Sequence, residues 1–132
     1  MTQTCCASAG VTRDVYTPDD LIMGDHVQTA EALLTPGVAY TRGDLLVLTA
    51  ATNTVVLATA ATLANANFIM PFTLTAAEAT AHVATGKQLQ YYNQGEYAQD
   101  RVKLAGVLLT PAQIITAKGA LSPRNIELRR VL

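Results

Sequence analysis

This sequence has few cysteines, no tryptophan and no long apolar run, and each of these features excludes a class of protein. Its 132 residues include two adjacent cysteines, Cys5 and Cys6, and two distant histidines, His26 and His82. Neighbouring cysteines rarely bridge each other without strain, so we expect two thiols, with neither a disulfide framework nor a metal site. No apolar stretch reaches the roughly 18 residues of a membrane-spanning helix, and the first residues do not resemble a secretory signal. We therefore expect a protein that is made in a cytoplasm and kept or assembled there.

Charge of either sign is also scarce. Nine Lys and Arg residues oppose ten Asp and Glu residues, for a net charge of −1. This balance offers no basic surface to DNA or RNA. Half of the residues are hydrophobic, but many of them are alanines. Each Å² of buried apolar surface contributes about 25 cal/mol, and a small side chain buries little surface. We therefore expect a thin core, with additional apolar burial between subunits.

The first half of the chain predicts an arm followed by short strands. Residues 1–20 are small and polar and lack periodicity, so we expect an extended N-terminal arm. Residues 26–34 favour a strand, although their TAEALL segment leaves a helix open because Ala, Glu and Leu are good helix formers. The apolar runs 45–48 and 55–58 predict a hairpin, and residues 68–70 predict a further strand that a proline ends.

The middle of the chain predicts a helix and then a hairpin. Residues 75–86 contain helix formers, a capping threonine and a final glycine, which together predict a short helix. From residue 87, apolar and polar residues alternate with the period of two that a half-buried strand requires. We expect this strand to turn at Asn93–Glu96, where Gly95 is free to take a positive φ angle, and to return from Tyr97.

The last part of the chain predicts a second helix and a final strand. Thr110 and Pro111 are good starting residues for a helix, which we expect to end at Gly119. Its inward face would contain Ile114, Ile115 and Ala117. Residues 125–130 then alternate apolar and polar side chains. Together these elements predict a mainly β (α+β) fold: one small β-rich domain over residues 21–132 with one or two short helices, preceded by the arm over residues 1–20.

The sequence contains no recognisable catalytic motif. It has no GxSxG, P-loop, GxGxxG or HExxH pattern. Asp25 and His26 are neighbours, but adjacent side chains of a strand point to opposite faces and cannot orient each other for acid–base chemistry. Arg42-Gly43-Asp44 matches an adhesion triplet, yet the same three residues are ordinary turn chemistry. We therefore expect no enzyme, no cofactor and no metal.

Three tyrosines cluster around the predicted turn. Tyr91, Tyr92 and Tyr97 each combine a large apolar body with a polar tip, which suits protein interfaces. We interpret them as candidate contacts with another subunit or with a partner. A position in the core or on a sheet face is the more common use of such residues, and it stays open.

Four blocks of the sequence, taken in order, resemble the lambda-type head decoration proteins of tailed bacteriophages. They are DLIMGD at residues 20–25, GVAYTRGDLLVL at 37–48, YYNQGEY at 91–97, and a short helix followed by IELRRVL at 126–132. The order and spacing of the blocks carry the resemblance, which covers roughly residues 15 to 132. The mid-chain segment FIMPFTL departs from the strand that is usual in the family, and the Cys5-Cys6 arm has no counterpart.

The resemblance implies a β-tulip fold and a structural role in the virion. Homotrimers would bind the major capsid protein at three-fold and quasi-three-fold positions on the outer surface of the expanded head. There they would act as a cementing protein that stabilises the shell against internal DNA pressure, with no nucleic acid or membrane as partner. The arm would order on binding and add a strand to capsid elements. The arm residues expected to contact the capsid are Tyr16, Leu21, Ile22 and Met23.

One consequence of this interpretation can be checked, and one alternative stays open. Deletion of residues 1–23 is expected to leave a folded domain that no longer binds capsids. The residues also leave open an alternative in which the chain is a trimeric phage tail, fibre or host-surface binding module. Such a module would bind host cells or glycans and ignore the head.

Overall fold

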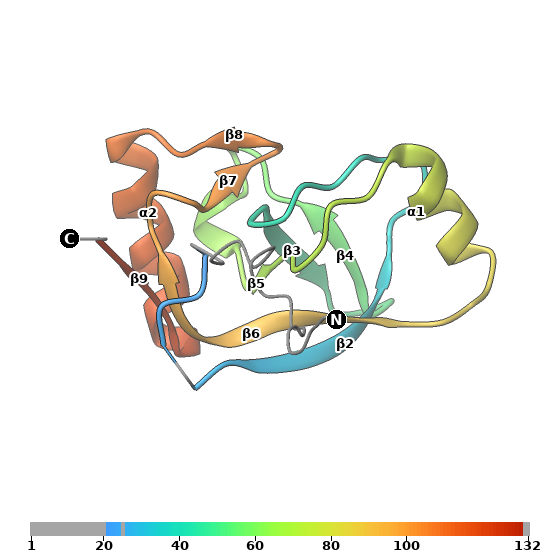
Figure 1. Ribbon diagram of the computed structural model, residues 1–132, viewed down its shortest axis with the longest axis horizontal. Coiled ribbons are helices and arrows are strands. Elements are labelled where there is room, and N and C mark those ends of the chain that lie inside the picture. The colour runs from blue at the N-terminus through green and yellow to red at the C-terminus, as the bar shows by residue number, and fades with distance from the viewer. Residues whose placement is uncertain (1–20, 25, 131–132) are drawn as a thin grey trace, which may run out of the picture.

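The structure, a computed structural model, describes residues 21–24 and 26–130, and most of its elements are short strands (Figure 1). In chain order the elements are β2 (Gln28–Leu34), β3 (Leu45–Thr49), β4 (Thr54–Leu57), η2 (Leu63–Asn65), β5 (Phe68–Ile69), α1 (Ala76–Val83), β6 (Leu89–Ala98), β7 (Lys103–Leu104), β8 (Val107–Leu108), α2 (Pro111–Leu121), η3 (Ser122–Arg124) and β9 (Ile126–Arg129). A β-rich domain with two α-helices in this part of the chain confirms the expected fold class. The two α-helices lie at opposite ends of the molecule (Figure 1).

Five of the described strands form a closed ring. The strand order is β2-β4-β3-β5-β6, and β6 pairs back onto β2. The β2–β4 pair is parallel, and the other four pairs are antiparallel. Closure leaves the ring with few open strand edges. Outside the ring, β9 joins the C-terminal half of β6 in parallel.

Two separate apolar cores lie on the two faces of this ring. One core takes side chains from all five ring strands and therefore fills the interior, where Ala79 of α1 also lies. The other core lies on the outer side of β3, β5 and β6, where Ala117 and Leu121 of α2 cover it. Leu45 belongs to the outer core and Leu46 to the inner one. This explains why β3 is apolar at successive positions, since both of its faces are buried.

The helix starts and the first hairpin agree with the sequence. Thr75 Oγ1 accepts a hydrogen bond from Glu78 N–H at 3.1 Å, and Glu78 Oε1 accepts one from Thr75 N–H at 2.8 Å. Thr110 begins α2 with the same reciprocal capping. The predicted hairpin is the β3–β4 pair. The helix alternative for TAEALL is wrong, because Ala32 and Leu34 point into the ring with the period of a strand.

The expected end and inward face of α2 need correction. The helix continues through Gly119 to Leu121, which is fully buried. Ile114, Ala117 and Leu121 stand at i, i+3 and i+7, so they form the inward stripe. Ile115 lies off this stripe and is 72 % exposed. Burial of Leu121 extends the helix past the glycine, and the helix gives way to η3 at Ser122–Arg124.

The predicted turn at Asn93–Glu96 is wrong, because β6 runs through it without reversing. At Gly95 the strand changes partners: antiparallel β2 lies beside its first half and parallel β9 beside its second. Gly95 has a φ of +132°, and a Cβ there would lie 3.2 Å from Val27 Cα and 3.1 Å from Tyr97 Oη. The glycine is therefore required for its positive φ angle and close contacts at the change of strand partner, rather than for a reversal.

Candidate functional site

Residues 21–23 attach the start of the described chain to the second half of β6. Met23 N–H donates to Glu96 O at 2.9 Å, and Ala98 N–H donates to Leu21 O at 2.7 Å. Ile22 lies between these bonds, opposite Tyr97 in an antiparallel bridge. In such a pair the N–H and C=O of Ile22 point away from β6. The segment therefore presents a backbone edge that faces away from β6, directly after the predicted arm.

These contacts correct the prediction for Leu21. Its side chain is only 4 % exposed and belongs to the outer core, so it cannot fill a pocket on another protein. A deletion through Met23 would remove a core residue and two backbone hydrogen bonds, so a truncation should stop before Leu21. Ile22 is half-buried and Met23 is 41 % exposed. Tyr16, like the rest of residues 1–20, lies outside the described residues.

Tyr91 and Tyr97 are fully buried inside the domain. Tyr91 stacks on Phe68 in the ring interior, with 6.1 Å between the ring centroids. Tyr97 lies in the outer core and donates its hydroxyl hydrogen to Gln94 O at 2.8 Å. Burial raises the pKa of both hydroxyls above the usual value. The core alternative holds for these two tyrosines, and the prediction that their side chains form an interface is wrong.

Tyr92 is partly buried and holds the arginine of the Arg42-Gly43-Asp44 triplet. Arg42 Nη1 donates to Tyr92 Oη at 3.1 Å and also to Pro71 O. The guanidinium carbon lies 5.6 Å from the centroid of the Tyr92 ring, within the range of a cation–π contact. Arg42 is therefore engaged inside the domain.

Asp44 is the only buried polar or charged residue in the described part of the chain, with 1 % of its surface exposed. Its carboxylate accepts hydrogen bonds from Thr41 N–H at 2.7 Å and from Gly106 N–H at 2.8 Å. Lys103 N–H donates to Gly43 O at 2.9 Å beside it. The triplet is thus a structural turn that fastens the β7–β8 hairpin, which agrees with its interpretation as turn chemistry.

The β7–β8 hairpin carries an apolar surface that the sequence analysis missed. Ala105 and Gly106 form its two-residue turn, with φ angles of 51° and 83°. Val107 and Leu108 follow, 68 % and 49 % exposed. In Figure 1 the hairpin lies along the top of the molecule, beside the start of α2. The available signal was a glycine between two apolar pairs, which is typical of a tight hairpin.

A groove lies beside the first turns of α2. Its volume is about 390 Å³, and its apolar wall consists of Pro111, Ile114 and Ile115. Asp100, Lys118 and Arg130 also line it. An apolar wall with charged residues around it is suited to binding an aliphatic side chain.

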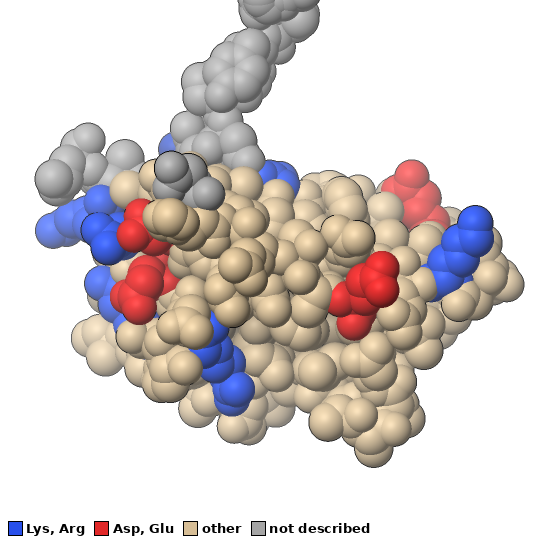
Figure 2. Space-filling model, turned by 90° about the horizontal axis from the view of Figure 1, so that it is seen from below, with Lys and Arg blue, Asp and Glu red and all other residues tan. Residues whose placement is uncertain are grey.

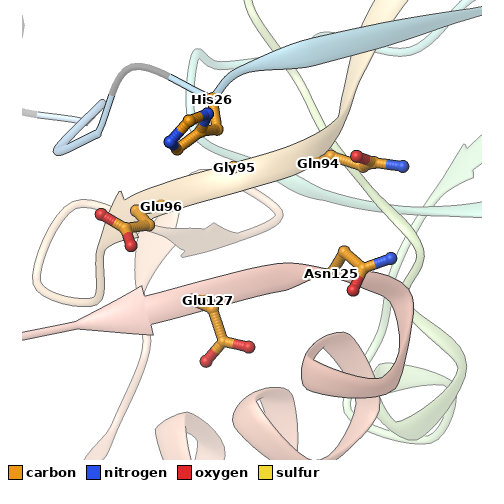
Figure 3. A pocket seen from close by; sticks show the side chains of 6 residues that line it. All are labelled: His26, Gln94, Gly95, Glu96, Asn125 and Glu127. Atoms are coloured by element: carbon orange, nitrogen blue, oxygen red, sulfur yellow. The ribbon is translucent and has the colours of Figure 1, made fainter.

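A polar cleft of about 290 Å³ lies where residue 26, β6 and β9 meet (Figure 3). Glu96 and Glu127 are partners in the β6–β9 register, but Arg129 Nη2 pairs with Glu96 at 2.9 Å and Ser122 Oγ bonds Glu127 at 3.2 Å. Figure 3 shows the Glu127 side chain directed away from His26 and Glu96. These side chains do not converge on one point, as an acid–base site would require.

Seen from below, charged side chains lie over both halves of the molecule, with more of them at the end that contains α2 and β9 (Figure 2). Over residues 21–24 and 26–130, no group of three or more His, Cys, Asp or Glu residues could hold a metal ion. Within the same ranges, no helix has the length and hydropathy needed to cross a membrane.

Comparison with known proteins adds no relative. No protein-family model matches the chain, and no curated protein matches it either.

Proposed function

We propose that this protein decorates the outside of a bacteriophage head. Homotrimers bind the major capsid protein at three-fold and quasi-three-fold positions of the expanded shell and stabilise it against internal DNA pressure. The observation that best supports this proposal is the attachment of residues 21–23 to β6, with the Ile22 backbone directed away from β6. In the sequence, residues 1–20 precede this edge.

A backbone edge that does not bond β6, with a polar segment before it in the sequence, suits strand addition. An extended segment gains main-chain hydrogen bonds from a sheet of the partner, while its side chains set the register. Met23, 41 % exposed, is available for such a contact. Ordering the arm costs free energy, so each site is weak. Attachment through three arms raises avidity by about 10²–10⁴-fold when the geometry allows simultaneous binding.

The proposal assigns no catalytic role to the polar cleft. Its two described carboxylates are engaged by Arg129 and Ser122. Its side chains do not surround a point where a reacting atom would lie.

Co-sedimentation with undecorated heads of the phage tests the proposal. The full chain is expected to bind expanded shells saturably, near one trimer per three-fold position, and to ignore unexpanded procapsids. Failure to bind either form would reject the proposal and favour the tail or host-surface alternative.

Two variants then locate the binding edge. A chain that starts at Leu21 is expected to keep its fold, because Leu21 and its hydrogen bonds remain, but to lose binding. Ile22→Pro removes the outward N–H and spares the bonds of Leu21 and Met23, whereas Ile22→Val keeps that N–H as a matched control. Weaker binding of Ile22→Pro alone is expected, and equal binding of both would exclude this edge.

A further inference from the structure

The groove beside the first turns of α2 combines an apolar wall with positive charge. Ile115 in that wall is 72 % exposed although it lies in a well-formed helix. Lys118 and Arg130 also line the groove, and neither makes an ion pair with another described residue. These two cations outnumber the one carboxylate of the groove, Asp100. The groove therefore favours a partner that carries apolar side chains together with negative charge.

A further groove residue, Gln99, lacks a hydrogen-bond donor. Its side-chain oxygen Oε1 is buried and has no hydrogen-bond partner among the described residues. Buried polar atoms of proteins are normally satisfied, so an occupant that brings donors is favoured. Each residue of a peptide other than proline brings a backbone N–H. An acidic peptide with an apolar side chain therefore fits the groove.

The chain itself contains such a peptide directly before Leu21. Residues 14–20 read Asp-Val-Tyr-Thr-Pro-Asp-Asp, with three carboxylates and no lysine or arginine. Val15 and Tyr16 are the large apolar side chains of this segment. Tyrosine is common at interfaces because it combines a large apolar body with a polar tip.

The described chain begins close to the groove. Leu21 belongs to the outer core, and Ile114 of the groove wall packs against the same core. Ala98 N–H donates to Leu21 O at 2.7 Å, and the next residue of the chain, Gln99, lines the groove. Because residues 21–23 are antiparallel to β6, the direction from Met23 to Leu21 leads along β6 toward Gln99.

The tether favours this segment over other acidic peptides. Seven extended residues span up to about 25 Å, so residues 14–20 can reach the groove from Leu21. A short tether also gives an effective concentration in the millimolar range. A separate peptide of the same chemistry would have to exceed that concentration to compete.

We propose that residues 14–20 dock in the α2 groove of their own chain. Tyr16 covers Ile115, and the carboxylates of the segment face the two cations. Tyr16 then belongs to the surface of its own domain rather than to a capsid contact, and residues 1–13 remain for a partner. The contact does not rest on the proposed function, and its tests use no phage heads, so the failure of either one is distinguishable from the failure of the other.

Disulfide trapping in the full-length protein tests the contact. Cys5 and Cys6 are replaced by serine, and Thr17→Cys is combined with Ile115→Cys under mild oxidation. A disulfide within one chain is expected, with a yield that does not change on dilution. In the control, Val107→Cys replaces Ile115→Cys, because Val107 is 68 % exposed on β8 and lies outside the groove. A yield no higher than that of the control, or cross-links only between two copies, would overturn the proposal.

Chymotrypsin provides a second measurement, because cleavage after Tyr16 requires the segment to leave the groove. Lys118→Glu with Arg130→Glu is expected to make this cleavage about 3–10-fold faster, since two attractive charge pairs at the surface are lost. Lys87→Glu with Arg124→Glu makes the same change in net charge at exposed residues outside the groove. That control is expected to be cleaved at the wild-type rate. Equal cleavage rates for the two pairs of substitutions would overturn the proposal.

Discussion

Replacement of Asp44 by alanine tests whether one buried carboxylate fastens the β7–β8 hairpin. The substitution leaves Thr41 N–H and Gly106 N–H without their acceptor. An orphaned buried donor costs about 1–3 kcal/mol. Gly106 itself is exposed, so water can reach its N–H once the carboxylate is gone. We therefore expect the free energy of unfolding to fall by about 2–4 kcal/mol, below the full cost of two buried orphans.

Two further substitutions separate the hydrogen bonds from the charge. Asp44→Asn keeps one carbonyl oxygen as acceptor but turns an amide NH₂ toward the other donor. Its expected loss is about half that of Asp44→Ala. Asp100→Asn makes the same change in charge at an exposed carboxylate, so it is expected to stay within about 0.5 kcal/mol of the wild type.

Urea unfolding followed by circular dichroism measures these differences, because a domain of this size commonly unfolds in one step. Hydrogen exchange at the Gly106 amide reports the hairpin directly. If Asp44→Ala unfolded at the same urea midpoint as Asp100→Asn, the carboxylate would contribute nothing net, and the reasoning would be refuted. Loss of Gly106 protection in Asp44→Ala is expected together with the fall in global stability.

Three other changes have defined expected outcomes. Ala105→Gly should raise the free energy of unfolding by about 0.5–1 kcal/mol, because alanine is strained at a φ of 51°; a lower thermal midpoint would contradict this. Gly95→Ala should lower the free energy of unfolding by at least about 2 kcal/mol because of the close contacts at Gly95. Gly119→Ala should raise it by up to about 1 kcal/mol, because the space around Gly119 is open. Equal effects of the two substitutions in urea unfolding would contradict both predictions. Burial raises the pKa of Tyr91 and Tyr97 above 10.0, so the unfolded chain releases these protons at lower pH than the folded chain does. The free energy of unfolding should therefore be highest below about pH 10 and fall above it. A urea midpoint that stays constant from about pH 8 to 11 would contradict this.

The sequence predicted local structure where the signal is itself local. The capping threonines Thr75 and Thr110 begin their helices because each bonds a residue only three positions away. The alternation of Ile126 and Leu128 with Glu127 and Arg129 gives the final strand, since a strand buries every second side chain. Such patterns need no knowledge of the partner.

The wrong predictions concern residues whose structure depends on a partner that is distant in the sequence. Gly95 is compatible with a turn or with a kinked strand, and only β9, more than 25 residues later, selects the strand. Gly119 does not end α2, because Leu121 is buried against the outer core. Leu21 seemed to belong to an arm because the strand it pairs with lies over 70 residues away. In each case a tertiary contact overrides the local preference.

The predicted interface at Tyr91 and Tyr97 also failed because of tertiary contacts. Tyr91 fills the inner core and Tyr97 the outer core, and both are fully buried. In such a chain, every exposed aliphatic side chain is one that the core does not use. Val107 and Leu108 stand outside on a hairpin that a buried carboxylate holds in place, and Ile115 stands outside on a well-capped helix. Burial within the described part of the chain therefore does not account for the aliphatic character of these three positions.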